Sequence, residues 1–190
     1  AIGRAALSAN TTASNNTAVG FKAGDAITTG TRNTIVGSNA GLSFNQDDNT
    51  AIGFEAMRNG TNPTDCTAVG KDALYYCEGV GNVAVGKDSL TATTTGDKNT
   101  AIGMNAGGSI TTGDNNTCLG YNAGTANGPG GIFAGASNLV CLGDNNVTGL
   151  FCADTSISSS DSRDKTDITD FTKGLDWIKA LRPVTYRWDR

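Results

Sequence analysis

A glycine that follows two small or aliphatic residues recurs at an almost fixed interval through residues 1–126. The residue before this anchor glycine is always Ile, Val or Leu, and the one before that is Ala, Ile or Cys. Successive anchors are 16 or 17 residues apart, at Gly3, Gly20, Gly37, Gly53, Gly70, Gly86, Gly103 and Gly120. A period held over eight copies indicates a repeat architecture, in which one short unit stacks on its own copies.

The residues around the anchor predict a strand and a corner. The stretch Asn-Thr-Ala-Val-Gly is typical of a short strand that stacks on its copy in the next coil, about 4.8 Å away. The glycine supplies the positive φ that turns the chain. An asparagine stands four residues before the anchor in six copies, and we expect a ladder of stacked amides along the axis. Threonine-rich stretches at 26–29 and 91–95 favour a second strand in each coil.

A helical repeat is the competing interpretation, because two units would give the 33–34 residues of a helical repeat. Composition argues against it: 26 of 190 residues are glycine, and no segment has helical apolar periodicity. The sequence therefore predicts an all-β fold, a β-solenoid or β-roll of 16–17-residue coils.

Such a narrow rod predicts an oligomer. The inward positions are expected to be mostly Ala and Val, so one chain buries little apolar area against about 1–2 kcal/mol of backbone entropy per ordered residue. The repeat N-T-A-[VI]-G-x-x-A is similar to the head repeats of trimeric autotransporter adhesins and to repeats in phage tail fibres. This resemblance implies a homotrimer.

Composition excludes several classes of function. The net charge is −4 without a basic cluster, so we expect no nucleic-acid partner. No apolar run approaches the ~20 residues of a membrane span, so we expect no membrane insertion. The sequence has no histidine, and no cofactor or metal is expected. The five cysteines are interpreted as small buried residues of a reduced compartment; Cys118 and Cys141 occupy the small inward position, and Cys66 occupies the asparagine position.

The repeat ends before the C-terminal part. Residues 127–157 read as an irregular last coil and connector, with a final strand within 138–143. Residues 158–190 predict the truncated start of a small α+β module: a helix that begins near Asp170 or Thr172 and ends at about Leu181, then a strand with Val184, Tyr186 and Trp188 on one face. We expect the chain to be a fragment of a longer protein.

The C-terminal module resembles the intramolecular chaperone domain of phage tail spikes and tail fibres, the endosialidase-type auto-cleaving family. The matching residues are Ser160-Asp161-x-Arg163-x-Lys165, Asp167-Ile168 and Gly174-Leu175-x-x-Ile178-x-x-Leu181-Arg182-Pro183-Val184-x-Tyr186-x-Trp188. The resemblance implies self-cleavage of the Ser160–Asp161 bond, with Ser160 as nucleophile and Lys165 as base. Without it, the same residues would read as a polar linker and a solvated surface charge.

The expected function is that of a structural tail fibre segment of a bacteriophage virion, assembled in the host cytoplasm. Its partners would be two further copies, other tail proteins, and a host cell-surface receptor, expected to be a glycan. The alternatives are a bacterial trimeric surface adhesin head and a glycan-cleaving tail spike. Turnover catalysis would need two carboxylates in a groove, whereas the acidic residues fall mostly in turn or outward positions: Asp47, Asp48, Glu55, Asp65, Asp72, Glu78 and Asp88.

Overall fold

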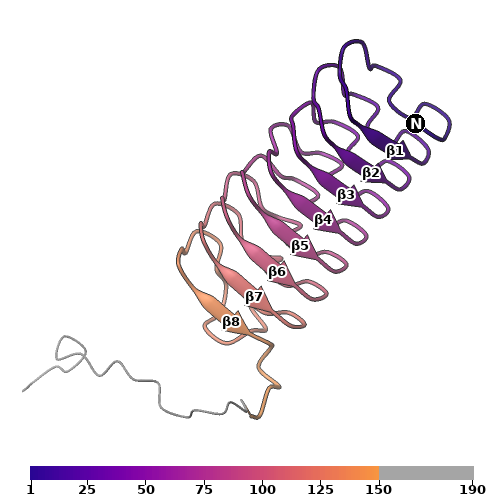
Figure 1. Ribbon diagram of the computed structural model, residues 1–190. Helices are drawn as coiled ribbons and strands as arrows, with labels where there is room; N and C mark the ends of the chain where they lie inside the picture. Colours follow the sequence, from indigo (N-terminus) through magenta and orange to yellow (C-terminus); the bar gives the residue numbers. More distant parts are fainter. Residues whose placement is uncertain (150–190) are drawn as a thin grey trace, which may run out of the picture. The chain divides into compact units, whose positions relative to one another are not determined.

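The computed structural model describes residues 1–149, whose regular structure consists of eight strands of three residues each. They are β1 (Thr17–Val19), β2 (Thr34–Val36), β3 (Thr50–Ile52), β4 (Thr67–Val69), β5 (Val83–Val85), β6 (Thr100–Ile102), β7 (Thr117–Leu119) and β8 (Val140–Leu142). Figure 1 shows the strands stacked in one row, with a loop of chain returning between each pair. The α+β module expected at residues 158–190 lies outside the described residues.

The strands form one parallel sheet in chain order, from β1 to β8. Each residue lies opposite the residue at the same repeat position, so that Ala18 faces Ile35 and Val19 faces Val36. Although the spacing grows to 23 residues before β8, Cys141 still lies opposite Cys118. One strand per coil in constant register is a β-solenoid, and the predicted fold class is confirmed.

Only the middle residue of each strand points into the core. These residues are Ala18, Ile35, Ala51, Ala68, Ala84, Ala101, Cys118 and Cys141, and none is more than 3% exposed. Their neighbours on both sides point outward, because side chains alternate along a strand. The expectation that Val shares the inward positions with Ala is therefore wrong: the aliphatic residue before each anchor glycine lies on the outer face.

Large core side chains come from the loop that follows the strand, at the fourth or the seventh position after the anchor glycine. Where the fourth residue is Gly41, the seventh is Phe44; where the fourth is Leu90, the seventh is Thr93, and all these side chains are buried. The two positions compete for the same space, since a Cβ on Gly41 would lie 2.8 Å from the Phe44 ring. The fillers provided in this way are Ile27, Phe44, Met57, Leu74, Leu90 and Ile110.

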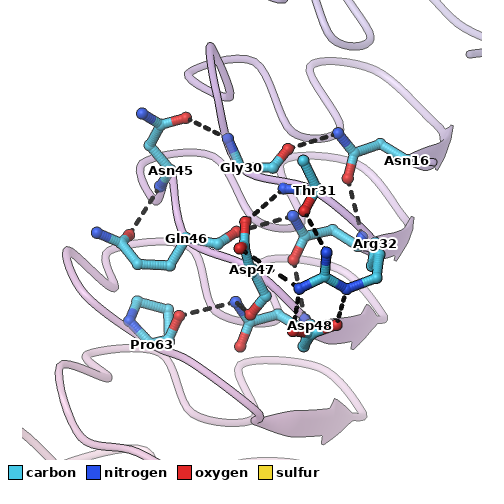
Figure 2. A network of polar contacts seen from close by, with 11 residues as sticks. Asn16, Gly30, Thr31, Arg32, Asn45, Gln46, Asp47, Asp48 and Pro63 are labelled. Carbon is cyan, nitrogen blue, oxygen red and sulfur yellow. Dashed lines mark hydrogen bonds and ion pairs between the residues drawn. The ribbon is translucent and has the colours of Figure 1, made fainter. Parts of the chain in front are cut away.

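The expected asparagine ladder is present, but its bonds run mainly to backbone. The side-chain oxygen of Asn33 accepts from the Asn49 amide (2.9 Å), and its nitrogen donates to the Gln46 carbonyl (2.8 Å). Asn49 repeats this pattern toward Cys66 (3.1 Å) and Pro63 (2.7 Å). Figure 2 shows part of this network. Each asparagine thus joins its coil to the next through two hydrogen bonds to backbone groups, which are buried or partly buried.

The second strand expected in the threonine-rich stretches is absent from residues 1–149. At 26–29 the backbone amides do not form a ladder: those of Thr28, Thr29 and Gly30 all donate to the Asn45 side-chain oxygen, at 2.7, 2.9 and 3.1 Å. Figure 2 shows the last of these bonds. A single side-chain acceptor gathers the amides into a turn, which overrides the β-propensity of threonine.

The corners of the coil use left-handed backbone, as expected for the anchor glycines. Gly103 has φ 134°, and a Cβ there would lie 2.6 Å from the Gly120 carbonyl oxygen. Residues other than glycine also have positive φ at further corners, in the left-handed helical region, as at Asp72 (φ 55°), Asp88 (φ 58°) and Leu90 (φ 47°). The repeat therefore holds several strained positions per coil, which only its stacking contacts can maintain.

Candidate functional site

An apolar stripe runs along the outer face of the sheet. It consists of the aliphatic residue before each anchor glycine and before Gly143, together with the apolar residues among those that follow the anchors. It includes nine of the fourteen exposed large hydrophobic side chains among residues 1–149. These nine are Ile2, Phe21, Ile52, Phe54, Ile102, Met104, Leu119, Tyr121 and Leu142. Val19, Val36, Val69 and Val85 complete the row as half-buried residues.

The stripe is continuous because the strands stack without a register shift. Val36 lies opposite Ile52, and Ile102 lies opposite Leu119. The first coil joins the row through a bridge between Ile2 and Val19. Contiguous apolar surface of this length is uncommon on a soluble monomer and marks an interaction surface.

Aromatic rings next to the anchor glycines contact cations from neighbouring coils. The Arg4 guanidinium lies 5.8 Å from the centre of the Phe21 ring, and the Lys71 ammonium lies 5.7 Å from that of Phe54. Such contacts are worth about 0.5–1 kcal/mol at exposed sites. These rings thus pack along the rod, although Phe21 and Phe54 keep 41% and 46% of their surface exposed.

Three of the acidic residues that the sequence places in turn positions line a single groove. Glu55, Asp72 and Asp88 come from three successive coils, each two residues after the anchor glycine. Tyr75, Tyr76 and Thr91 line the same groove. Sequence reasoning missed it, because the three carboxylates are adjacent only once the coils stack. The signal was the shared repeat position of the three residues.

All four cysteines in the described residues are buried free thiols, which confirms that they are small core residues. The Cys66 and Cys77 sulfurs lie 3.9 Å apart. The hydrogen bond with Cys66, together with burial, raises the pKa of the Cys77 thiol, and the same hydrogen bond lowers the pKa of Cys66. Burial raises the pKa of the Cys118 thiol to about 11.

Cys66 takes over the role of the asparagine that it replaces. Its sulfur accepts from the Asn82 amide (3.4 Å) and donates to the Gly79 carbonyl (3.3 Å). Asn33 and Asn49 make the same two kinds of bond to the coils that follow them. Because sulfur is a weak donor and acceptor, the ladder continues through this coil with weaker links.

Ser160, Asp161 and Lys165 lie outside the described residues, so their predicted roles in self-cleavage stay predictions. Within residues 1–149, no group of three or more His, Cys, Asp or Glu side chains has an arrangement suited to a metal ion. The same residues contain no helix with the length and apolar character needed to cross a membrane.

The comparison with protein families gives a match at the C-terminal end. Residues 160–190 match the family described as chaperone of endosialidase. The C-terminal segment is similar to this chaperone family. The match covers the residues that carry the resemblance in the sequence, and it confirms that resemblance. The comparison with curated proteins found no significant match, and neither did the comparison with solved structures.

Proposed function

We propose that this chain is a segment of a homotrimeric viral tail fibre or tail spike that contributes to host attachment. The observation that carries the proposal is the succession of a β-solenoid and a segment similar to the chaperone of endosialidase. In this proposal the solenoid is the structural rod, and the C-terminal segment begins a chaperone that brings three chains into register. The rod belongs to the virion and assembles in the host cytoplasm.

The apolar stripe supports the association of copies. About half of each of its nine exposed side chains remains open to solvent, and complete burial of such a side chain is worth about 1.5–3 kcal/mol. Association in the stripe would therefore gain roughly 1 kcal/mol for each residue, or about 9 kcal/mol per chain. That gain is of the same order as the cost of association, about 4–15 kcal/mol.

A three-fold arrangement gives each chain one line of contact along the common axis. A symmetric assembly of this kind buries the same patch on every copy. The stripe is a single line and not a broad face, which suits a rod that meets its partners along one edge. The number three follows from the resemblance of the repeats to trimeric adhesin heads.

The proposed end module would cleave itself once. The Ser160 hydroxyl of one copy attacks the carbonyl carbon of the Ser160–Asp161 peptide bond of a second copy in the trimer, because attack on its own carbonyl would close a four-membered ring. Lys165 accepts the hydroxyl proton. The Asp161 nitrogen leaves as an amine after it takes up a proton, and water then hydrolyses the ester on Ser160. Release of the chaperone would leave the assembled rod kinetically trapped, because the folding aid is gone.

A denaturing gel of the full-length product tests this function. We expect two fragments, which end and begin at the Ser160–Asp161 bond, and a single uncut chain for Ser160→Ala. Ser159→Ala is the matched control and should be cut like the natural chain. Lys165→Arg keeps the charge but not the base, since an arginine side chain does not give up its proton in proteins, so it should stay uncut. An uncut natural chain, or equal cutting of Ser160→Ala, would contradict the proposal.

A further inference from the structure

An open groove lies beside the rod where the coils of β3, β4 and β5 stack. Its volume is about 350 Å³, and it is lined by Glu55, Asp72, Tyr75, Tyr76, Asp88 and Thr91. Ligand pockets usually have volumes of about 300–1,000 Å³, so the groove has room for a small ligand or for one unit of a polymer. Its lining combines three carboxylates, the hydroxyl group of Thr91 and two tyrosine rings with their own hydroxyl groups.

The acidic side chains of the groove are already neutralised by basic neighbours. Lys71 pairs with Asp72, and Lys87 pairs with Asp88. Glu55 lies 3.7 Å from the guanidinium of Arg58. The groove therefore carries little net charge but many acceptor oxygens. A neutral ligand rich in hydroxyl donors fits this chemistry, whereas an anionic ligand would meet the carboxylates directly.

Two polar atoms near the groove have no hydrogen-bond partner. Within residues 1–149, Arg58 Nε and Asp72 Oδ1 are the two buried side-chain polar atoms in this state. Asp72 lines the groove itself, and Arg58 contacts two of the lining residues, Glu55 and Tyr75. Buried polar atoms are almost always paired, so a donor and an acceptor left open at one place require an explanation.

Tyr76 provides a fixed aromatic surface at the groove. It is 51% exposed, and its ring meets that of Tyr75 edge to face, with 4.7 Å between the ring centres. Tyr75 is in turn held by Arg58, which donates to its hydroxyl group at 2.8 Å. An exposed ring that is held from behind presents a large apolar face at low entropic cost.

We propose that this groove binds a neutral saccharide. The apolar face of a sugar ring would pack on Tyr76, and neighbouring hydroxyl groups of the sugar would donate to the carboxylate oxygens of Asp72 and Glu55. The inference rests on the proposed role in host attachment and names the chemical class of the receptor.

The groove and the apolar stripe occupy different positions of the repeat. The groove residues stand two, five and six positions after the anchor glycine, whereas the stripe residues stand directly before and after it. Asp72 is connected to the stripe through Lys71, which pairs with it and lies over the Phe54 ring. Tyr76 packs on Tyr75 instead, so a Tyr76 variant leaves the stripe side chains in place. Sugar binding and the association of copies can be measured separately.

Calorimetry of the full chain with defined polysaccharides tests the proposal. Dextran, mannan and galactan are the neutral probes, and polysialic acid is the anionic control. We expect the chain to bind at least one neutral probe and to bind polysialic acid more weakly. Tyr76→Ala should weaken binding by about ten-fold or more, because stacking on an aromatic ring is lost. Tyr76→Phe keeps the ring and should stay close to the natural chain.

Asp72→Asn tests the acceptor role, since asparagine tolerates the left-handed backbone at this position (φ 55°). We expect weaker binding of the neutral probe and an unchanged assembly mass. Three results would overturn the inference: no binding of any neutral probe, binding that Tyr76→Ala leaves intact, or a preference for polysialic acid. A change in assembly mass in Tyr76→Ala would also overturn it, because the groove would then belong to the contact between copies. Loss of self-cleavage or of assembly in the natural chain would instead count against the proposed function.

Discussion

The buried asparagine ladder should be a main source of stability, and Asn99→Ala tests this most sharply. Asn99 accepts a hydrogen bond from the Asn116 amide (2.9 Å) and donates one to the Gly113 carbonyl (2.8 Å). Alanine would leave both backbone groups without these partners in a coil that excludes water. Each unpaired buried group costs about 1–3 kcal/mol, so for the two groups we expect a loss of about 2–6 kcal/mol in the free energy of unfolding.

Urea unfolding followed by circular dichroism measures the effect, at one fixed chain concentration because assembly shifts apparent stability. Asn62→Ala is the matched control: Asn62 is exposed and accepts only one exposed bond, from Gln46, so we expect a change within about 0.5 kcal/mol. Hydrogen exchange should speed up at the Asn116 amide in Asn99→Ala. If both variants lose the same stability, or if Asn116 exchange is unchanged, the ladder is not a stabilising device.

Three further outcomes follow from the coil. Leu90→Gly removes the large core side chain of its coil and should lower the free energy of unfolding by about 2–5 kcal/mol. Adding Thr93→Ile moves the large side chain to the seventh position, as in other coils, and should restore part of that loss in the same urea assay. If stability does not recover, the two positions do not exchange this role. Cys66→Asn restores the asparagine position and its bond to the Gly79 carbonyl, so we expect a gain of about 1 kcal/mol, whereas a loss would show that the thiol is the better fit. Burial raises the pKa of the Cys118 thiol from 9.0 to about 11. The unfolded chain therefore loses this proton at a lower pH than the folded chain, and stability should fall as the pH rises from about 9 to about 11. Cys118→Ala should show a smaller fall in stability over that range, and an equal fall would assign the effect to other groups.

The period and the strand positions could be predicted because they depend on residue type alone. Alternation around Ala18 and the glycine after Val19 indicate a three-residue strand followed by a corner. Which face of the strand the Val19 side chain occupies could not be predicted in the same way, because small and aliphatic residues suit both faces. The structure buries the residue at the centre of each strand and places the aliphatic residue that follows it on the outer face.

The large core residues escaped prediction because no single repeat position holds them. Phe44 fills its coil from the seventh position and Leu90 from the fourth, and each position looks variable when it is aligned alone. The signal lies in the pair, since in each of the six coils with a fully buried filler the other position holds Gly, Cys or Thr. The groove at Asp72 and Tyr76 required the stacking distance as well, which no pattern within one coil contains.

Light scattering of the uncut Ser160→Ala chain tests the central claim most directly, namely that the apolar stripe is covered by further copies. We expect a mass three times that of the 19.3 kDa chain. Ile102→Asp places a charge at an exposed stripe position and should give single chains that keep the β-type circular dichroism spectrum. A natural stripe found on a stable single chain, or a trimer that Ile102→Asp leaves unchanged, would contradict the account.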